Sequence, residues 1–192
     1  IGGDAAASAL TGMLEPADAV STAAAAALER IGRDSEQHVS EALRNGNSSQ
    51  RRVLLPTISR SSVAPAVALC LVDDDPQVRS LACEALARTG SVSHAPEIFP
   101  LLGDANVRVA QAAVAAIQAL GSAATKVLAL RTADSVEPGI RRHGLRILGY
   151  FGFEEALPIF IAAIGNADAR LEELALSGLA YLDRPQALAA IL

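Results

Sequence analysis

One pattern occurs twice in this chain, and it limits the possible fold more than any other feature. The two stretches are "DDDPQVRSLACEALARTG" at 73–90 and "GDANVRVAQAAVAAIQALG" at 103–121. Each has an acidic turn, a Val-Arg pair, an alanine-rich run with apolar residues three or four apart, and a closing glycine. That spacing places the apolar residues on one face of a helix. Self-similarity at a period of about 20–50 residues indicates stacked structural units.

The arginine at the start of each alanine-rich helix sets the predicted register of the repeat. These arginines follow one another at nearly regular intervals, with one longer interval between Arg108 and Arg141, and one further step back reaches Ser21. Six units follow from this register. Four of them end in a glycine, the residue that most readily adopts the left-handed conformation at a helix end. The anchors are Arg51, Arg79, Arg108, Arg141 and Arg170, and the closing glycines are Gly32, Gly90, Gly121 and Gly152.

Each unit is predicted to contain two helices. The second is the clearer one, because it carries the amphipathic spacing. The first is shorter and often begins near a proline, as in "APEIFPLLG" at 95–103. Proline is tolerated in the first turn of a helix, where its missing N–H has no intrahelical partner. Pro100 and Pro158 lie deeper in their segments, so we expect them to bend or delay the first helix.

The repeat predicts an all-α fold, a right-handed α-solenoid of about six two-helix repeats. One helix pair cannot bury its apolar face alone, so neighbouring pairs must stack. The chain has no initiator methionine, and neither end has the polar face of a capping unit, which predicts a fragment of a longer protein. We expect residues 1–14 to be the remnant of a preceding repeat, and the array at 15–192 to consist of units at about 15–46, 47–73, 74–103, 104–134, 135–165 and 166–192.

The stretch "APEIFPLLGDANVRVAQAAVAAIQALG" at 95–121, echoed by "ALPIFIAAIGNADARLEELALSGLAYL" at 156–182, resembles the short HEAT-like repeat of the phycobilisome-lyase type. The resemblance extends from about Glu15 to the end of the chain. It implies an armadillo-like superhelix in which the second helix of each unit lines the concave side. Repeat folds serve many unrelated tasks, so the resemblance implies a fold more specifically than an activity.

The resemblance also implies a role for the regularly spaced arginines. In HEAT-like arrays such arginines pair with acidic residues of the turns between helices and join neighbouring units. The expected ladder therefore consists of Arg51, Arg79, Arg108, Arg141 and Arg170 with Asp73, Asp104 and Asp168 as their partners. The alternative is a column of arginines that binds an external anion.

A second column lies nine residues after the anchors. It contains Arg30, Arg60 and Arg88 in the first three units, whereas the same count reaches Ile117 and Tyr150 later in the chain. An arginine near a helix C-terminus complements the helix dipole, which contributes about 0.3–1 kcal/mol. The alternative is a partner-binding groove, cationic at one end and apolar at the other, that suits an acidic-hydrophobic peptide.

The segment "IRRHGLRILGYFGF" at 140–153 holds the densest basic cluster. Arg142 and Arg146 are four residues apart and share a helix face, so both are candidate partner-binding residues. The net charge of −5 and the pI near 5.2 argue against a nucleic-acid partner, because such domains are usually basic. The chain also lacks an apolar run long enough to insert into a membrane.

Catalytic and metal-binding patterns are not expected in this sequence. His38, His94 and His143 are isolated from other potential metal ligands, and no phosphate-binding loop or G-x-S-x-G motif occurs. Cys70 and Cys83 have no CxxC spacing and are predicted to be buried free thiols in a reducing, cytoplasmic compartment. The single lysine, Lys126, suggests the coding bias of a GC-rich bacterium.

These observations predict a non-catalytic scaffold without cofactor, which binds another protein or another domain of its parent chain. The family resemblance supplies an alternative, a phycobilin-lyase-like or chaperone-like subunit that binds a tetrapyrrole and its acceptor protein. Tetrapyrrole propionates would then contact Arg30, Arg60 and Arg88, and the rings would contact Ile117 and Tyr150. A third possibility is a structural spacer in which both arginine columns are internal contacts.

Overall fold

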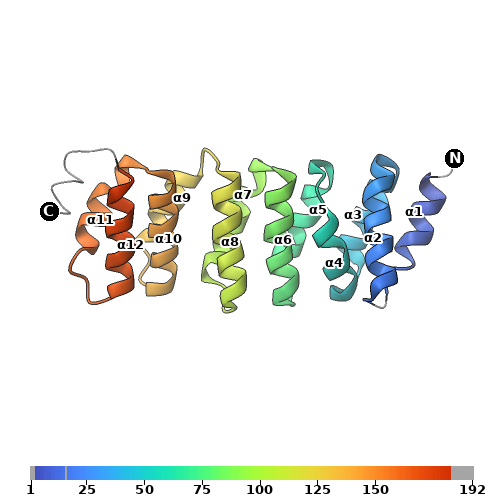
Figure 1. Ribbon diagram of the computed structural model, residues 1–192, viewed down its shortest axis with the longest axis horizontal. Coiled ribbons are helices and arrows are strands. Elements are labelled where there is room, and N and C mark those ends of the chain that lie inside the picture. The colour runs from blue at the N-terminus through green and yellow to red at the C-terminus, as the bar shows by residue number, and fades with distance from the viewer. Residues whose placement is uncertain (1–2, 16, 183–192) are drawn as a thin grey trace. The chain divides into compact units, whose positions relative to one another are not determined.

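The computed structural model describes residues 3–15 and 17–182 of the chain (Figure 1). These residues form α-helices and short 3₁₀ turns, with no strand among them. The predicted all-α class is therefore confirmed. The chain divides into two compact units, one up to residue 120 and one from residue 121, and each is described by itself.

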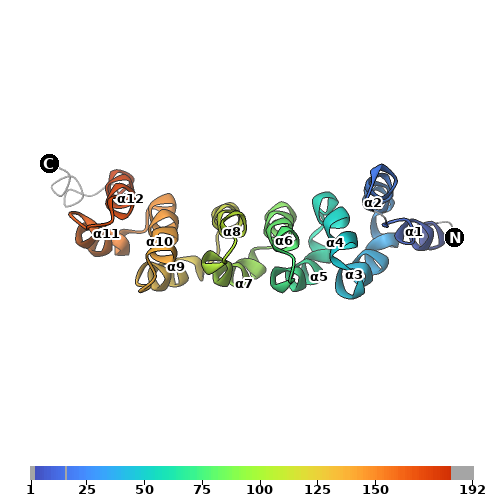
Figure 2. The same ribbon diagram turned by 90° about the horizontal axis from the view of Figure 1, so that it is seen from below.

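The first unit consists of helix pairs in two layers. The second helices of the pairs, α2, α4, α6 and α8, lie in one layer, and α3, α5 and α7 lie in the other (Figure 2). Helix α6 packs against both α4 and α8, and α1 packs against α2 and α3. The helices are α1 Gly3–Thr11, α2 Ala19–Ile31, α3 Glu36–Asn45, α4 Ser48–Leu54, α5 Ala64–Leu69, α6 Pro76–Thr89, α7 Ala95–Ile98 and α8 Val107–Leu120.

The second unit repeats the same arrangement. Helix α10 packs against α9 and α12, and α11 packs against α12. Its second helices are thus α10 and α12, and its first helices are α9 and α11. Their bounds are α9 Thr125–Ala133, α10 Pro138–Phe151, α11 Leu157–Ala163 and α12 Ala169–Ala180.

Polar side chains start most of the second helices, and glycines end them. Asp18, Asn47, Asp75 and Asp168 each accept hydrogen bonds from backbone N–H groups of the following first turn. Such caps satisfy donors that have no partner inside the helix. The four predicted closing glycines all have positive φ angles, 79° at Gly32, 64° at Gly90, 55° at Gly121 and 63° at Gly152. The expected left-handed conformation is confirmed at Gly90 and Gly152, whereas Gly32 has a ψ of −132° and is not left-handed.

Prolines shorten several helices. Helix α7 ends at Ile98 and continues as a 3₁₀ turn that contains Pro100, while α11 begins only at Leu157, just before Pro158. The predicted bending and delay are confirmed. Pro56 has an effect that was not predicted from the sequence, because α4 ends at Leu54 and is only 7 residues long. Proline lacks the N–H that the next helical hydrogen bond would need.

The start of each second helix corrects the predicted register. From α6 onward these helices begin at Pro76, Val107, Pro138 and Ala169, so their intervals along the chain are equal. The buried residues agree, because Ala82 and Leu86 of α6 correspond to Ala113 and Ile117 of α8 at that same interval. The longer interval expected between Arg108 and Arg141 arose because Arg108 lies two residues too early in its helix.

Two of the five predicted anchors are therefore out of register. Arg51, Arg79 and Arg141 are each the fourth residue of their helix, whereas Arg108 and Arg170 are each the second. A two-residue shift rotates a side chain by more than half a turn around the helix axis. These two arginines must consequently face a different environment from the other three.

Small residues allow the helices of the second unit to approach closely. A methyl group added at Gly144 of α10 would lie 2.4 Å from the backbone nitrogen of Ala133, and one added at Gly149 would lie 3.1 Å from the Cα of Gly178 in α12. Contacts of that length between backbones cannot be relieved by moving a flexible side chain. The packing of α9, α10 and α12 thus depends on glycine.

We expect Gly144→Ala to lower the free energy of unfolding by about 1–3 kcal/mol, because overpacking forces the backbone of α9 away from α10. Urea denaturation followed by circular dichroism would measure this change. Gly139→Ala is the matched control, since a methyl group there meets nothing within 4 Å. That substitution should be neutral or stabilise by up to about 1 kcal/mol. Equal stability of the two variants would contradict the prediction.

Candidate functional site

The first unit contains two complete steps of the expected arginine ladder. The guanidinium of Arg51 forms an ion pair with Asp73, and that of Arg79 binds both carboxylate oxygens of Asp104 at 2.7 and 2.9 Å. Arg51 also donates to the carbonyl of Leu43 at 2.8 Å, at the end of the preceding first helix. Each of these arginines therefore joins its own repeat to the turn of the next one.

The ladder lowers the pKa of its carboxyl groups. The hydrogen bonds from Arg79 are the main reason that the pKa of Asp104 lies below its ordinary value of 3.8, and they outweigh the opposing effect of burial. Burial acts most strongly on Asp73 and would raise its pKa, but hydrogen bonds from the Asp75 backbone, Arg51 and Ser48 together lower it. Both carboxylates are thus ionised structural acceptors.

The other three predicted anchors differ from this pattern. Asp168 accepts from Arg142 at 2.7 and 2.8 Å, so this predicted acidic partner binds Arg142, a predicted partner-binding residue, and not Arg141. Arg170 forms an exposed ion pair with Glu173 of its own helix at 2.6 Å. Arg108 is exposed and forms no ion pair within the described part of the chain.

Arg60 and Arg88 are bound to the ends of preceding helices. Arg60 donates to the carbonyl of Glu29 at 2.7 Å, and Arg88 donates to the carbonyls of Leu55 and Ile58 at 2.6 and 3.2 Å. The carbonyls at a helix C-terminus lack helical partners, so a guanidinium stabilises them. At these two positions the arginines expected to form the cationic end of a groove instead make internal contacts. Replacing both by acidic residues would therefore perturb folding as well as the surface charge.

The remaining residues of the second column also need correction. Ile117 is fully buried, so the prediction that it lines a binding surface is wrong. In the corrected register the positions equivalent to Arg88 are Ala119 in α8, Tyr150 in α10 and Tyr181, which directly follows the end of α12. The side chain of Tyr150 is 60% exposed, and Arg30 is exposed in the last turn of α2. Arg146 is half-buried on α10.

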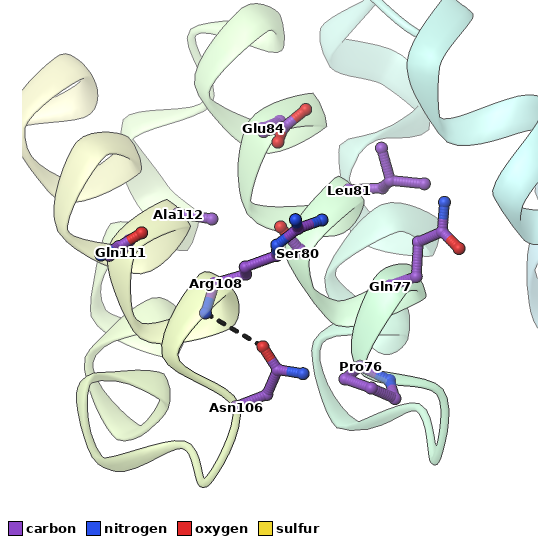
Figure 3. A pocket seen from close by; sticks show the side chains of 9 residues that line it. All are labelled: Pro76, Gln77, Ser80, Leu81, Glu84, Asn106, Arg108, Gln111 and Ala112. Carbon is purple, nitrogen blue, oxygen red and sulfur yellow. Dashed lines mark hydrogen bonds between the residues drawn. The ribbon is translucent and has the colours of Figure 1, made fainter.

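A groove of about 660 Å³ lies between α6 and α8 in the first unit (Figure 3). Of the predicted site residues, it contains only Arg108, whose guanidinium extends from α8 toward α6 (Figure 3). The backbone N–H of Arg108 donates to the side chain of Asn106 at 3.0 Å, which holds the start of α8. The groove is lined by Pro76, Gln77, Ser80, Leu81 and Glu84 on one side and by Asn106, Arg108, Gln111 and Ala112 on the other.

The groove offers hydrogen-bonding groups on both of its walls. Gln77 and Gln111 carry amides that can each donate and accept, as the peptide groups of an extended chain require. Ser80 adds a hydroxyl, and Leu81 and Ala112 add apolar surface. These residues were not predicted from the sequence. The signal that would have given the correct register is Asn106, which precedes α8 as the capping Asp75 precedes α6.

The described residues show no group of three or more His, Cys, Asp or Glu side chains that could hold a metal ion. They also include no helix with the length and apolar character that a membrane span requires. Cys70 and Cys83 are buried, and burial raises the pKa of their thiols to about 11 and about 12. Thiols with such pKa values are poor nucleophiles at neutral pH, because the thiolate is the reactive form.

Comparison with known proteins supports the identification of the repeat. Residues 63–143 match the family model for HEAT repeats, which confirms the predicted HEAT-like repeats over this part of the chain. The chain is 38% identical over 78 residues to phycocyanobilin lyase subunit beta of Thermosynechococcus vestitus. That match covers 41% of this chain and 36% of the relative, so the chain spans about a third of the relative's length.

One solved structure shows the same kind of fold. The superposition on an engineered protein covers 92% of this chain and 98% of the engineered chain, with a TM-score of 0.57. The identity is 14%, so this similarity concerns the fold alone. The complex of CpcE and CpcF of phycocyanin lyase from Nostoc sp. PCC7120 has 25% identity and a TM-score of 0.47, over 97% of this chain and 80% of that chain.

We expect Asp104→Asn to lower the melting temperature at neutral pH, because Arg79 loses its ionised acceptor. A hydrogen bond to a charged group contributes about 1.5–3 kcal/mol. Since the folded-state pKa of Asp104 lies below 3.8, its contribution is complete above that pH and is lost as the pH falls through the folded-state value. The difference between variant and wild type should therefore narrow below pH 3.8 in thermal melts followed by circular dichroism.

Asp74→Asn is the control for this measurement, because Asp74 is exposed and its side chain forms no ion pair in the described residues. Its melting temperature should stay close to that of the wild type, within about 0.5 kcal/mol of stability. Two outcomes would show that the ion pair does not stabilise the fold. In one, Asp104→Asn and wild type have the same melting temperature at neutral pH; in the other, their difference in melting temperature stays constant down to strongly acidic pH.

Proposed function

We propose that this chain is a non-catalytic repeat scaffold that binds an extended segment of another protein, or of another domain of its parent chain. The binding site is the groove between α6 and α8. The observation that carries this proposal is Arg108, whose exposed guanidinium lies in a groove lined otherwise mainly by amide, hydroxyl and small apolar groups. An ionised side chain that the described residues leave without an ion pair is available to a ligand.

The chemistry of the groove specifies the bound segment. Arg108 favours an acidic side chain, because arginine and carboxylate form charge-assisted hydrogen bonds. Gln77 and Gln111 lie on opposite walls and can bind the backbone of an extended peptide. Glu84 lies further along α6 and disfavours a second acidic group at that end of the groove. The expected ligand thus carries its acidic residue near the beginning of α8.

A cytoplasmic location belongs to the same proposal. Cys70 and Cys83 are both free thiols in the first unit, although oxidising compartments favour disulfides. Their burial gives them the role of small apolar core residues, which requires no oxidation. The two cysteines therefore support a reducing compartment.

We expect Arg108→Glu to weaken binding of the partner at least tenfold. A bound segment would cover Arg108, and loss of a buried hydrogen-bonded charge pair at an interface costs about 2–5 kcal/mol. Affinity capture from the source cells, quantified by mass spectrometry, identifies proteins enriched by the wild type but not by the variant. Arg131→Glu is the matched control, since Arg131 is an exposed arginine on the first helix α9. The proposal fails if a folded Arg108→Glu variant enriches the same proteins as the wild type.

The similarity to a phycocyanobilin lyase subunit favours one second function, that of a tetrapyrrole-binding subunit. The residues predicted for it do not form an open site, because Arg60 and Arg88 bind backbone carbonyls and Ile117 is buried. We therefore expect no change in the absorbance spectrum of phycocyanobilin on titration with micromolar protein. A saturable spectral shift would favour the tetrapyrrole-binding subunit over the scaffold.

A further inference from the structure

At Arg141 the ladder keeps its arginine but lacks the acidic partner. In the first unit Arg79, the fourth residue of α6, binds Asp104 in the turn before the next second helix. In the second unit Arg141 is the fourth residue of α10, and the position that corresponds to Asp104 is Asn166. A neutral amide thus stands where the two steps of the first unit have a carboxylate, Asp73 or Asp104.

Arg141 has lost the contacts that its equivalents make. Its Nε atom is buried and has no hydrogen-bond partner among the described residues. No ion pair to Arg141 occurs in the part of the chain that the structure describes, and Arg142 takes the nearby carboxylate of Asp168. A buried donor without an acceptor destabilises a fold, and a charged donor does so most strongly. An anion bound at Arg141 would therefore stabilise the fold by accepting this hydrogen bond.

A pocket of about 290 Å³ lies directly at this arginine. Its polar groups are Arg141, Asn166 and Asp134, and the rest of its wall is apolar, including Leu145 of α10 and Ile159 of α11. All of these residues belong to the second unit. The pocket thus combines one cation with an aliphatic surface that suits a group of a few carbon atoms.

We propose that this pocket binds a carboxylate that carries a short aliphatic group. The ligand's carboxylate takes the place of the aspartate side chain that Asn166 replaces, and it accepts hydrogen bonds from the guanidinium of Arg141. The aliphatic group lies against Leu145 and Ile159. This inference is independent of the proposed scaffold function, because that function rests on residues of the other unit.

Asp134 limits the charge of the ligand. Its side chain also lines the pocket, and no ion pair joins it to Arg141 in the described structure. The carboxylate of Asp134 repels each additional negative charge on the ligand, so a monoanion is favoured over phosphate or a dicarboxylate. The amide of Asn166 can donate one more hydrogen bond to the bound oxygen.

The same chemistry has two sources, a free aliphatic acid or the C-terminal residue of a peptide. Two probes distinguish them, 4-methylpentanoate for the free acid and N-acetyl-leucine for the peptide end. Their uncharged counterparts, 4-methylpentanamide and N-acetyl-leucinamide, keep the aliphatic group and remove the charge. The Nε–H resonance of Arg141 in ¹H–¹⁵N NMR spectra of the whole chain reports binding at the proposed acceptor.

We expect a saturable shift of that resonance with at least one carboxylate probe, and binding at least tenfold weaker for its amide. The probe that binds more tightly identifies the source. Absence of binding by either acid at millimolar concentration, or equal binding of acid and amide, would overturn the proposal.

Asn166→Asp provides the sharpest variant, because it restores the carboxylate of the ladder. It should melt at a higher temperature than the wild type and bind the probe at least tenfold more weakly, since the new side chain occupies the guanidinium. Arg141→Gln should lose binding without the gain in melting temperature. Arg146→Gln, on the same helix but outside the pocket, should bind like the wild type. If Asn166→Asp binds the probe as tightly as the wild type, the probe does not bind at Arg141 and the proposed site is wrong.

Discussion

The structure depends on the burial of alanine-rich second helices against one another. Ala82 and Ala85 of α6 are fully buried, and so is Ala113 of α8. Such small side chains let helices approach closely, but each one removes little apolar surface from water. No single helix pair therefore has a core of its own, and stability comes from the sum of contacts between neighbours.

The polar backbone groups at the helix ends and in the turns need hydrogen-bond partners from other residues. The arginines of the ladder provide them, because each guanidinium binds the turn of the next repeat, a carbonyl of the preceding helix or turn, or both. Arg60 and Arg88 do the same at the opposite ends of the helices. These arginines are therefore internal structural contacts, unlike exposed arginines such as Arg131.

Much of this architecture could be predicted from the sequence, because it depends on local patterns. Amphipathic spacing and closing glycines identified the helix pairs, and Pro100 and Pro158 were correctly expected to disturb the first helices. The pairing of Arg79 with Asp104 is consistent with the expected ladder, because both residues lie in the repeated pattern itself.

The candidate site could not be predicted as well, because surface positions depend on the exact register. A shift of two residues leaves the helix pattern recognisable but moves Ile117 from the expected surface into the core. The same shift placed Arg108 among the ladder arginines, although it lies in the groove between α6 and α8. The starts of the second helices, not the arginines, keep a constant interval from α6 onward.

Arg108 and Arg141 are available to ligands for two different physical reasons. Arg108 lies two residues too early in its helix to reach the ladder, so its charge points into a surface groove. Arg141 lies in the ladder position, but Asn166 stands in place of the aspartate, so its guanidinium has no ion pair among the described residues and lines a pocket. The first arrangement suits an extended chain that can lie across exposed helices, and the second suits a small group that can enter a confined space. In this repeat protein the contacts of the arginine ladder recur from unit to unit. Arg108 and Arg141 lack that contact, and this leaves their guanidinium groups available to other molecules.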